Sequence, residues 1–536
     1  MAPPGEQWGI WLMRRFLLRI RPHCRALGVA MFALHCHCAA AGEATIVPAD
    51  LPAVDRIDER FQSFNVEMVE VTGGPFWKPY AADSVASRDG TAQSAASGSA
   101  DEKTDTKADL VSTRSPIDLE NPLLRKFASA LAPAYLRVSG TFANSIFFAG
   151  PNGAPSQVPA GYKGVLTSRR WRDVIDFSNA IDAPIVTSFA ISPGSRDATG
   201  LWKPDQAREM ISATRQAGGH IAAAEFMNEP DLPAIGGAPA GYDVDAFAAD
   251  FSVFHAFMKQ AAPNVVILGP GTIGRSSEDA RLFLAAAPHI DAVSYHYYGA
   301  LSERCAGGQT ADAALSEGWL SRTGRTFAFY RALRDRAAPG KPIWLTETAE
   351  AACGGDRWSS TFLDTFRYLD QLGRLAKAGV QIVMHNTLVG SDYGLLEEGT
   401  FRPRPDYWAA LLWRQWMGPV VLDAGVRVRR GLHVYAHCQR HVPGGVVLLV
   451  INNDPQNEHQ LVLSIASVRF TLDAATLQDT AVRLNGAVLA ANDVDRLPQL
   501  AGVPANAGSL KFAPATITFV VISGAGNRSC AGHPAP

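Results

Sequence analysis

The sequence lacks the signatures of several protein classes. It has no Cys-x-x-Cys pair and no Cys/His spacing typical of zinc ligands, so no metal site is expected. No glycine-rich phosphate loop follows the first predicted strand, which disfavours a doubly wound nucleotide-binding sheet. The 49 Lys and Arg residues nearly balance 51 Asp and Glu residues, for a formal net charge of -2. This balance does not indicate a nucleic-acid-binding protein.

Long apolar runs are also scarce. One run spans residues 26–34, follows a cluster of arginines and precedes three alanines at 39–41. A short apolar run with a basic start and small residues after it predicts a signal peptide over residues 1–41 rather than a membrane anchor. No later segment predicts a membrane span. We therefore expect a secreted or periplasmic protein; the sequence does not indicate its oligomeric state.

Cysteine is rare as well. Of the seven cysteines, three lie in the predicted signal peptide. The other four are Cys305, Cys353, Cys438 and Cys530. An even number of cysteines in an exported chain predicts two disulfides, and the sequence alone permits three pairings.

Short β-rich runs and helical patterns alternate through the middle of the chain. The predicted strands are 64–71, 134–139, 184–190, 220–227, 265–269, 292–298, 342–348 and 381–388. Helical patterns lie between most of them, for example at 123–132, 171–180 and 205–217. Eight strands separated by helices predict an α/β fold, a (β/α)8 TIM barrel, over residues 61–418.

The regions outside this alternation differ in composition. Residues 82–116 are rich in Ser, Ala, Asp, Lys, Thr and Gly, and they predict a polar flexible loop at the catalytic face. Strand patterns joined by turns predict a C-terminal β-sandwich domain over residues 419–530, followed by a tail at 531–536. Its predicted strands are 426–437, 446–451, 460–465, 467–472 and 515–522. We expect the segment 42–60 to contribute a strand to this domain.

Two of the predicted barrel strands end in a glutamate. The fourth strand runs into Asn228-Glu229-Pro230, and the seventh ends in Thr346-Glu347-Thr348. A barrel carries its chemistry at the carboxyl ends of its strands, and strands four and seven face each other across the mouth. Hydrolysis of a glycosidic bond needs one protonated and one ionised carboxyl group flanking that bond. The sequence therefore predicts a glycoside hydrolase with Glu229 and Glu347 as the catalytic pair.

Other polar residues lie near the same strand ends. Glu225 has the strand parity of Glu229 and is predicted to be a supporting acid one layer deeper. Glu350 lies beyond its strand end and is an alternative nucleophile. The amide of Asn228 is expected to bond the 2-hydroxyl of the sugar. His296 and Tyr298 are expected either to hold the nucleophile by a hydrogen bond or to pack in the barrel rim.

The barrel topology also bears on the disulfides. Cys305 follows the sixth strand and Cys353 follows the seventh, so their loops are neighbours. A Cys305–Cys353 bridge would brace the rim of the active site. Cys438 and Cys530 would then join two parts of the β-domain.

As a set, these motifs resemble the heparanase-like β-glucuronidases of glycoside hydrolase family 79. The resemblance extends from about residue 61 to 530 and rests on Tyr135–Thr141, Asn228–Pro230, His296–Tyr298, Trp344–Thr348, Pro405–Trp408 and His433–Cys438. It implies a retaining mechanism that needs no cofactor, with Glu229 as acid/base and Glu347 as nucleophile. It also implies that Cys438 and Cys530 correspond to the family's β-domain disulfide.

The resemblance further implies sugar-binding positions. The family binds the glucuronate carboxylate through backbone groups of a glycine-rich loop and a tyrosine, which here match Gly354, Gly355 and Tyr393. Backbone N–H groups can bind an anion without a neighbouring cation. Three further residues fall where the family contacts the terminal sugar: Glu67, Thr141 and Asn144.

Three functions follow from these observations. The first is an endo-β-glucuronidase acting on a glycosaminoglycan-like polysaccharide. The second is an exo-β-glucuronidase that releases terminal glucuronate from glycans. The third is a non-catalytic glycan-binding relative, which would have lost one of the two glutamates. The extended basic clusters expected of a heparan sulfate site are not evident, since Arg169, Arg170 and Arg172 fall on one predicted helix.

Overall fold

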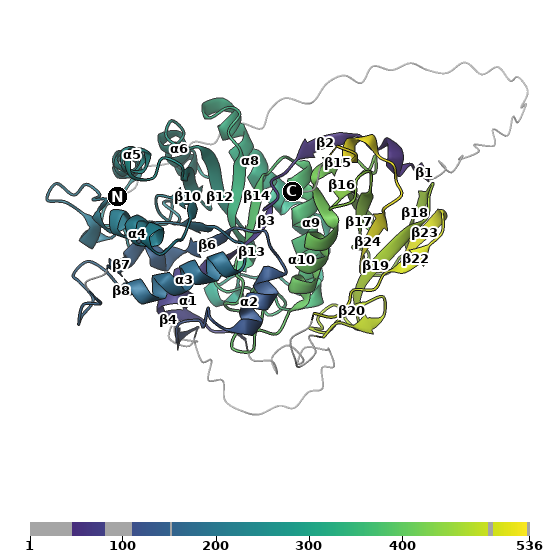
Figure 1. The fold of residues 1–536 in the computed structure, drawn as a ribbon, viewed down its shortest axis with the longest axis horizontal. Helices are drawn as coiled ribbons and strands as arrows, with labels where there is room; N and C mark the ends of the chain where they lie inside the picture. The colour runs from purple at the N-terminus through teal and green to yellow at the C-terminus, as the bar shows by residue number, and fades with distance from the viewer. Residues whose placement is uncertain (1–44, 81–109, 151–152, 491–496, 533–536) are drawn as a thin grey trace, which may run out of the picture. The chain divides into compact units, whose positions relative to one another are not determined.

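The computed structural model describes residues 45–80, 110–150, 153–490 and 497–532 (Figure 1). The predicted signal peptide and residues 82–109 of the predicted polar loop lie outside these residues. Within them, no helix is both long enough and apolar enough to cross a membrane.

Eight parallel strands form a closed barrel, which confirms the predicted (β/α)8 fold. In chain order they are β3 (Gln62–Glu67), β6 (Leu136–Ser139), β9 (Ile185–Thr187), β10 (Ile221–Glu225), β11 (Val266–Thr272), β12 (Ala292–Leu301), β13 (Ile343–Ala352) and β14 (Ile382–His385). The outer helices include α2 (Pro122–Ser129), α3 (Ser168–Ala180), α4 (Asp205–Gln216), α5 (Val244–Ala261), α6 (Ser277–Ala286), α8 (Arg322–Ala337), α9 (Phe362–Lys377) and α10 (Pro405–Trp416). Figure 1 shows these helices around the strands.

Apolar periodicity explains why the helices pack on the strands. In α3, Trp171, Val174, Ile175 and Ser178 are buried, a spacing that places them on one helix face. The Thr167 side chain accepts a hydrogen bond from the Arg170 amide and so caps this helix. Inside the barrel, a separate apolar cluster closes the interior: Val186, Ala223, Leu268, Ala292, Trp344, Ile382 and Met384.

A nine-stranded sheet lies beside the barrel. It contains β2 (Ala53–Arg56), β15 (Met417–Leu422), β16 (His433–Gln439), β17 (Val446–Asn452), β19 (Ser467–Ala474), β20 (Val482–Leu484), β21 (Ala487–Val488), β22 (Val503–Ala505) and β24 (Thr516–Ile522). A smaller sheet joins β1 (Thr45–Ile46), β18 (His459–Leu463) and β23 (Gly508–Phe512). Segments from both ends of the described chain thus meet in these sheets, since β1 pairs with β18 and β2 with β15.

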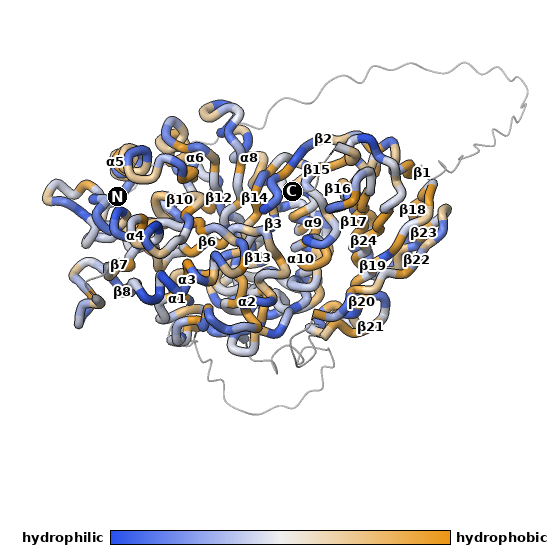
Figure 2. Tube along the Cα trace, viewed as in Figure 1, coloured by the Kyte–Doolittle hydropathy of each residue, from blue (hydrophilic) through white to orange (hydrophobic). Residues whose placement is uncertain are grey.

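The central strands of the large sheet are buried on both faces. Leu449, Ile451 and Phe519 belong to the same apolar core as the barrel helices. Their sequence neighbours Leu448 and Val520 point the other way, into a second core shared with the small sheet. Burial on both faces explains why β17 and β24 are almost continuously apolar, and hydrophobic residues follow these strands in Figure 2.

A buried polar cluster joins the sheet to the barrel. His433 of β16 contacts Asp370 of α9 through Nδ1 at 2.6 Å and Glu317 of α7 (Glu317–Leu320) through Nε2 at 2.7 Å. Arg374 and Tyr435 also bond Asp370, both at 2.5 Å. Burial would lower the pKa of His433, but Asp370 and Glu317 raise it to about 9. The histidine is therefore a cation that ties the two layers together at neutral pH.

The structure differs from the sequence predictions at four places described here. The first strand ends at Glu67 rather than residue 71, because Glu67 and Glu70 form a capping box that begins α1 (Met68–Thr72). The end of the predicted polar loop is a strand, β5 (Val111–Arg114), which pairs with β4 (Gly74–Trp77). Residues 426–432 are not a strand, so β16 begins at His433. Another pair not predicted is β7 (Ile146–Ala149) with β8 (Gly164–Thr167).

Both disulfides are present. The bridge between Cys305 and Cys353 joins the segments that follow β12 and lead out of β13, with its Cα atoms 6.4 Å apart. The bridge between Cys438 and Cys530 ties β16 to the C-terminal 3-10 helix Arg528–Cys530. The first braces the barrel rim, and the second closes the β-domain.

Candidate active site

The structure brings the two predicted catalytic glutamates together. Glu229 lies four residues beyond the end of β10 with a positive φ of 49°, a backbone conformation that few non-glycine residues adopt. Glu347 lies within β13. One carboxylate oxygen of each residue and one ring nitrogen of His296 all lie within 4.8 Å of one another. A single sugar unit can therefore contact both carboxyl groups.

Glu347 is surrounded by groups that favour its ionised form. The Tyr298 hydroxyl donates to Oε1 at 2.7 Å, and Arg137 Nη1 donates to Oε2 at 2.7 Å. Burial would raise the pKa of Glu347, but His296, Arg137 and Tyr298 hold it below its ordinary value. An ionised carboxylate in this position is suited to attack or to electrostatic stabilisation.

Glu229 has the opposite tendency. Burial raises its pKa, the hydrogen bond with His296 opposes that effect, and the charge of Glu347 adds to it, so that the net shift is upward. His296 Nδ1 lies 3.0 Å from Glu229 Oε1. Two nearby carboxyl groups whose pKa values are pushed apart are suited to act as an acid and a base, and Glu229 is the more readily protonated of the two.

His296 links the two glutamates. Burial would lower its pKa, but Glu347, Glu225 and Glu229 raise it to about 10. Its Nε2 lies 3.2 Å from the donor Nη2 of Arg137, whereas Nδ1 faces Glu229. Nδ1 therefore carries a proton in either charge state of the ring, and it donates that proton to Glu229 as a hydrogen bond.

Arg137 of β6 is the centre of this buried network. Its Nε and Nη2 donate to Glu225 Oε2 at 3.1 and 2.9 Å, and Nη2 donates to Asn228 Oδ1 at 2.8 Å. Its side chain is only 1% exposed. No role of its own was predicted for Arg137 from the sequence. Its place in a strand of buried residues could have pointed to such a role, because a buried charge needs polar or oppositely charged partners.

An irregularity in β13 aims two adjacent side chains at the barrel interior. The pairing of β12 with β13 shifts between Tyr295 and His296, so that His296 pairs with Glu347 and Thr346 is left out. Thr346 Oγ1 donates to Glu225 Oε1 at 2.8 Å, while Glu347 contacts Arg137. A regular strand would send one of these two side chains outward; the bulge brings both to the site.

Asn144 and Asn228 hold the segment that carries Glu229. Asn144 Oδ1 accepts from the Asn228 amide at 2.9 Å, and its Nδ2 donates to the Asn228 carbonyl at 2.8 Å. Asn144 thus uses both ends of its side chain on backbone. Arg137 donates a hydrogen bond to Oδ1 of Asn228. The Nδ2 group of the Asn228 side chain takes no part in these contacts.

Glu67, Tyr393 and Asn386 lie on the side of Glu347. Asn386 Nδ2 donates to the Tyr298 hydroxyl at 2.9 Å and to the Tyr393 hydroxyl at 3.4 Å. Burial raises the pKa of Glu67 well above its ordinary value, with Glu347 adding to the effect and Arg137 opposing it. Sequence reasoning missed Asn386, since nothing in its local pattern marks it.

Three positions in this region require glycine for steric or conformational reasons. A Cβ on Gly140 would lie 1.6 Å from Glu67 Oε2, so only glycine fits there. Gly354 and Gly355 both have positive φ, and a Cβ on Gly354 would lie 2.5 Å from Ser391 Oγ. Arg304 Nη1 fixes this loop by donating to the carbonyl of Gly355 at 2.8 Å. Thr141, by contrast, is exposed at the start of the 3-10 helix Thr141–Ser145.

Two further acids lie near the catalytic strands. Glu350 is fully buried, accepts from the Asp356 amide at 3.0 Å and bonds Ser359, so it faces a different set of residues from Glu229 and Glu347.

Asp231, which was not identified from the sequence, accepts from the amides of Ile273 and Gly274 at 3.1 and 2.9 Å. Burial and the charge of Glu229 raise its pKa to about 7. Asp231 thereby ties the Glu229 segment to the loop after β11.

Glu229, His296 and Glu347 are also spaced as metal ligands could be. Arg137 already bonds Glu347 at 2.7 Å and lies 3.2 Å from His296 Nε2. A divalent cation would have to share the carboxylate with this guanidinium. The residues present therefore fit acid–base chemistry better than a resident metal.

The sequence matches a known family. The sequence model of the glycosyl hydrolase family 79 N-terminal domain matches residues 107–373. Heparanase-like protein 1 of Arabidopsis thaliana is 29% identical over 65% of this chain and 67% of its own. Heparanase of Mus musculus is 28% identical over 77% of this chain and 88% of its own. Baicalin-β-D-glucuronidase of Scutellaria baicalensis is 26% identical over 78% and 86%.

A solved structure shares the fold. The crystal structure of a 4-O-α-L-rhamnosyl-β-D-glucuronidase from Fusarium oxysporum 12S matches with a TM-score of 0.58. The match covers 90% of this chain and 99% of that chain at 13% sequence identity. It supports the barrel with its β-domain as one architecture.

Proposed function

Because the chain is a glycoside hydrolase of the heparanase-like family 79, we propose that it is a retaining endo-β-glucuronidase acting on a glycosaminoglycan-like polysaccharide. The observation that carries the mechanism is the divergence of the two carboxyl groups. The pKa of Glu229 is raised and that of Glu347 is lowered, although one oxygen of each lies within 4.8 Å of the other.

The geometry supports a two-step displacement. Glu347 attacks the anomeric carbon while Glu229 gives its proton to the departing glycosidic oxygen, which leaves a glycosyl ester on Glu347. Glu229 then takes a proton from water as the water oxygen displaces Glu347. Retaining enzymes hold their carboxyl groups about 5–5.5 Å apart and inverting enzymes about 6.5–9.5 Å. One oxygen of each carboxyl group lies within 4.8 Å of the other, which is compatible with the shorter, retaining arrangement.

The surrounding residues would support each step. His296 Nδ1–H stabilises the ionised Glu229 that forms as the leaving group departs. The Nδ2 group of Asn228 is placed to donate to the 2-hydroxyl of the bound sugar. Gly354, Gly355 and Tyr393 are the proposed contacts for the uronate carboxylate, with Glu67 and Thr141 toward the terminal sugar. In this proposal Asn144 acts through the Asn228 backbone.

The proposed location is outside the cytoplasm, secreted or periplasmic. The two disulfides fit an oxidising compartment. The proposed partner is a glucuronate-containing polysaccharide or glycoside.

An exo-β-glucuronidase is the second candidate. It is favoured by the similarity to baicalin-β-D-glucuronidase, whose name gives baicalin rather than a polysaccharide as its substrate. A non-catalytic glycan-binding relative has less support, because both glutamates are present.

Two substrates separate these candidates. The purified protein is incubated with p-nitrophenyl β-glucuronide and, in parallel, with size-defined heparan sulfate. Shortened polymer with slow nitrophenol release supports the endo enzyme, whereas nitrophenol release with unchanged polymer length supports the exo enzyme. Proton NMR of the first product formed then identifies its anomer. Initial release of the α-anomer would contradict retention, and hydrolysis of neither substrate would overturn the glucuronide assignment.

A further inference from the structure

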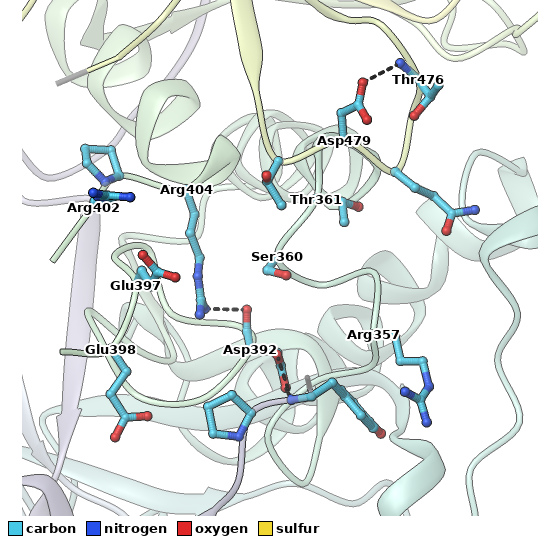
Figure 3. Close-up of a pocket in the computed structure, with 15 residues that line it drawn as sticks. Arg357, Ser360, Thr361, Asp392, Glu397, Glu398, Arg402, Arg404, Thr476 and Asp479 are labelled. Carbon is cyan, nitrogen blue, oxygen red and sulfur yellow. Dashed lines mark hydrogen bonds between the residues drawn. The ribbon is translucent and has the colours of Figure 1, made fainter. Parts of the chain in front are cut away.

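A cavity of about 780 Å³ lies where the barrel meets the large sheet. Its wall comes from four segments: Pro79–Tyr80, residues 357–361 after β13, residues 392–404 after β14, and residues 476–480 between β19 and β20. Glu229 and Glu347 do not line it. Figure 3 shows Arg404, Asp392 and Ser360 facing its centre, with Thr476 and Asp479 on the β-domain side.

Most residues of the wall have polar side chains. Apart from two prolines and the ring of Tyr80, its residues carry hydroxyl, amide, guanidinium or carboxylate groups. Arg304 and Arg357 stack on the Tyr80 ring at 3.7 and 4.3 Å from its centroid. Sites for apolar ligands are lined mainly by aliphatic and aromatic side chains. This cavity instead suits a ligand with many hydrogen-bonding groups.

Some charged groups of the wall form ion pairs and others do not. Asp392 pairs with Arg304, and Glu398 pairs with Arg114 at 2.8 Å. Among the described residues, neither Arg402 nor Arg404 forms an ion pair with a carboxylate. Burial lowers the pKa of Arg404, against the opposing effect of Asp392, Glu397, Glu398 and Asp406. An anionic group entering the cavity would meet two guanidiniums that form no ion pair with a described carboxylate.

The cavity adjoins the proposed uronate-recognition loop. Arg404 Nη1 donates to the carbonyls of Ser391 at 2.6 Å, Asp392 at 2.7 Å and Gly394 at 3.3 Å. These three residues flank Tyr393, whose hydroxyl lies 3.4 Å from Asn386 on the catalytic side. One short segment thus separates the cavity from the reaction centre, and Arg404 supports that segment.

We propose that this cavity is a second saccharide site, which holds an acidic sugar of the substrate chain away from the bond being cleaved. Arg402 and Arg404 take the carboxylate or sulfate group. The hydroxyls of Ser360 and Thr476 and the carboxylates of Glu397 and Asp479 take sugar hydroxyls. The site rests on the proposed function, since it assigns the ligand as part of the same acidic polymer. It gives long substrates a contact that a single glucuronide cannot make.

The test compares substrates of different length. The values of kcat/KM are measured for p-nitrophenyl β-glucuronide and for glucuronate-containing oligosaccharides of increasing length. The variants are Arg402→Ser and Gln478→Ala, both at exposed positions of the wall, and Arg169→Ser on α3 is the matched control. We expect Arg402→Ser to lower the long-to-short ratio of kcat/KM by about tenfold, mainly through KM, as for a lost charged hydrogen bond. Gln478→Ala lowers it less, and the control leaves it at the wild-type value.

The outcomes separate the second site from the proposed function. Equal loss on all substrates means that Arg402 acts structurally, and an unchanged ratio in both wall variants means that the cavity binds no part of the substrate; either result overturns the second site. If the unaltered protein hydrolyses no glucuronide of any length, the proposed function itself fails. Activity on the nitrophenyl glucuronide with no gain from longer chains rejects the second site alone.

Discussion

The barrel mouth and the centre of the nine-stranded sheet are both buried, but charged side chains form the mouth and apolar side chains form the sheet. At the mouth, Arg137, Glu225, His296 and Glu347 are each no more than 5% exposed, and their charges are paired with one another. The centre of the sheet is apolar on both faces. Buried ion networks are seldom better for stability than apolar packing of the same volume. The mouth is therefore organised for chemistry and the sheet for stability, and substitutions in the two regions should affect different measurements.

The largest effect is expected from Glu347→Gln. Loss of the nucleophile should lower kcat by at least about 10⁴-fold, because the glutamine amide cannot form the glycosyl ester. The rate of substrate hydrolysis by the variant is measured, both as observed and corrected for the fraction of the variant that is folded. Glu120→Gln, at an exposed position, is the control and should retain full activity. Substantial turnover by Glu347→Gln would contradict its assignment.

The next effect is expected from Arg137→Lys. Lysine keeps the charge but cannot bond Glu225, Asn228 and Glu347 together as the guanidinium does. We expect kcat/KM to fall by about 10²-fold, as when a positioning contact is lost. The acidic limb of the pH–rate profile should also move to higher pH, because Glu347 is held less firmly in its ionised form. A uniform loss with an unmoved limb would indicate a structural role instead.

A substitution in the sheet should lower stability and leave turnover unchanged. Leu448→Ala removes a fully buried side chain from the outer face of β17 and should cost about 2–5 kcal/mol of unfolding free energy. Denaturation by urea measures that loss. Active-site titration counts the active molecules, so that turnover can be given per folded molecule. Turnover should stay near the wild-type value. A large fall in turnover at full folding would mean that the two regions are coupled more closely than their packing indicates.

The smallest effect is expected from the cluster that joins the regions. Because the pKa of His433 is raised to about 9, its stabilising contribution is complete below its unfolded value of about 6.5 and is lost as the pH rises through 9. The loss should reach at most about 3 kcal/mol. In His433→Gln, unfolding free energy should vary less over this range. An equal decline in variant and wild type would assign the pH dependence to other groups.

The sequence predicted the barrel because its signals are repeated and local. Eight apolar runs between amphipathic helices leave few alternatives, and the position of Glu229 and Glu347 at opposed strands follows from topology. Arg137 and Asn386 were not identified, because their importance lies in contacts between distant strands. The inward placement of both Thr346 and Glu347 depends on a bulge that alternation does not reveal. The cavity beside Asp392 needs four segments far apart in sequence, so no local pattern could predict it.

The double burial of β17 and β24 has a consequence for protein engineering. The sheet shares its apolar core with the barrel helices and is therefore a wall of the catalytic unit. Truncation after Trp416 would uncover the helix faces that now pack on Leu449 and Phe519, leaving an aggregation-prone surface rather than a minimal catalyst. Chimaeras of this enzyme should therefore be joined within surface loops, and the barrel and the sheet should come from the same parent protein.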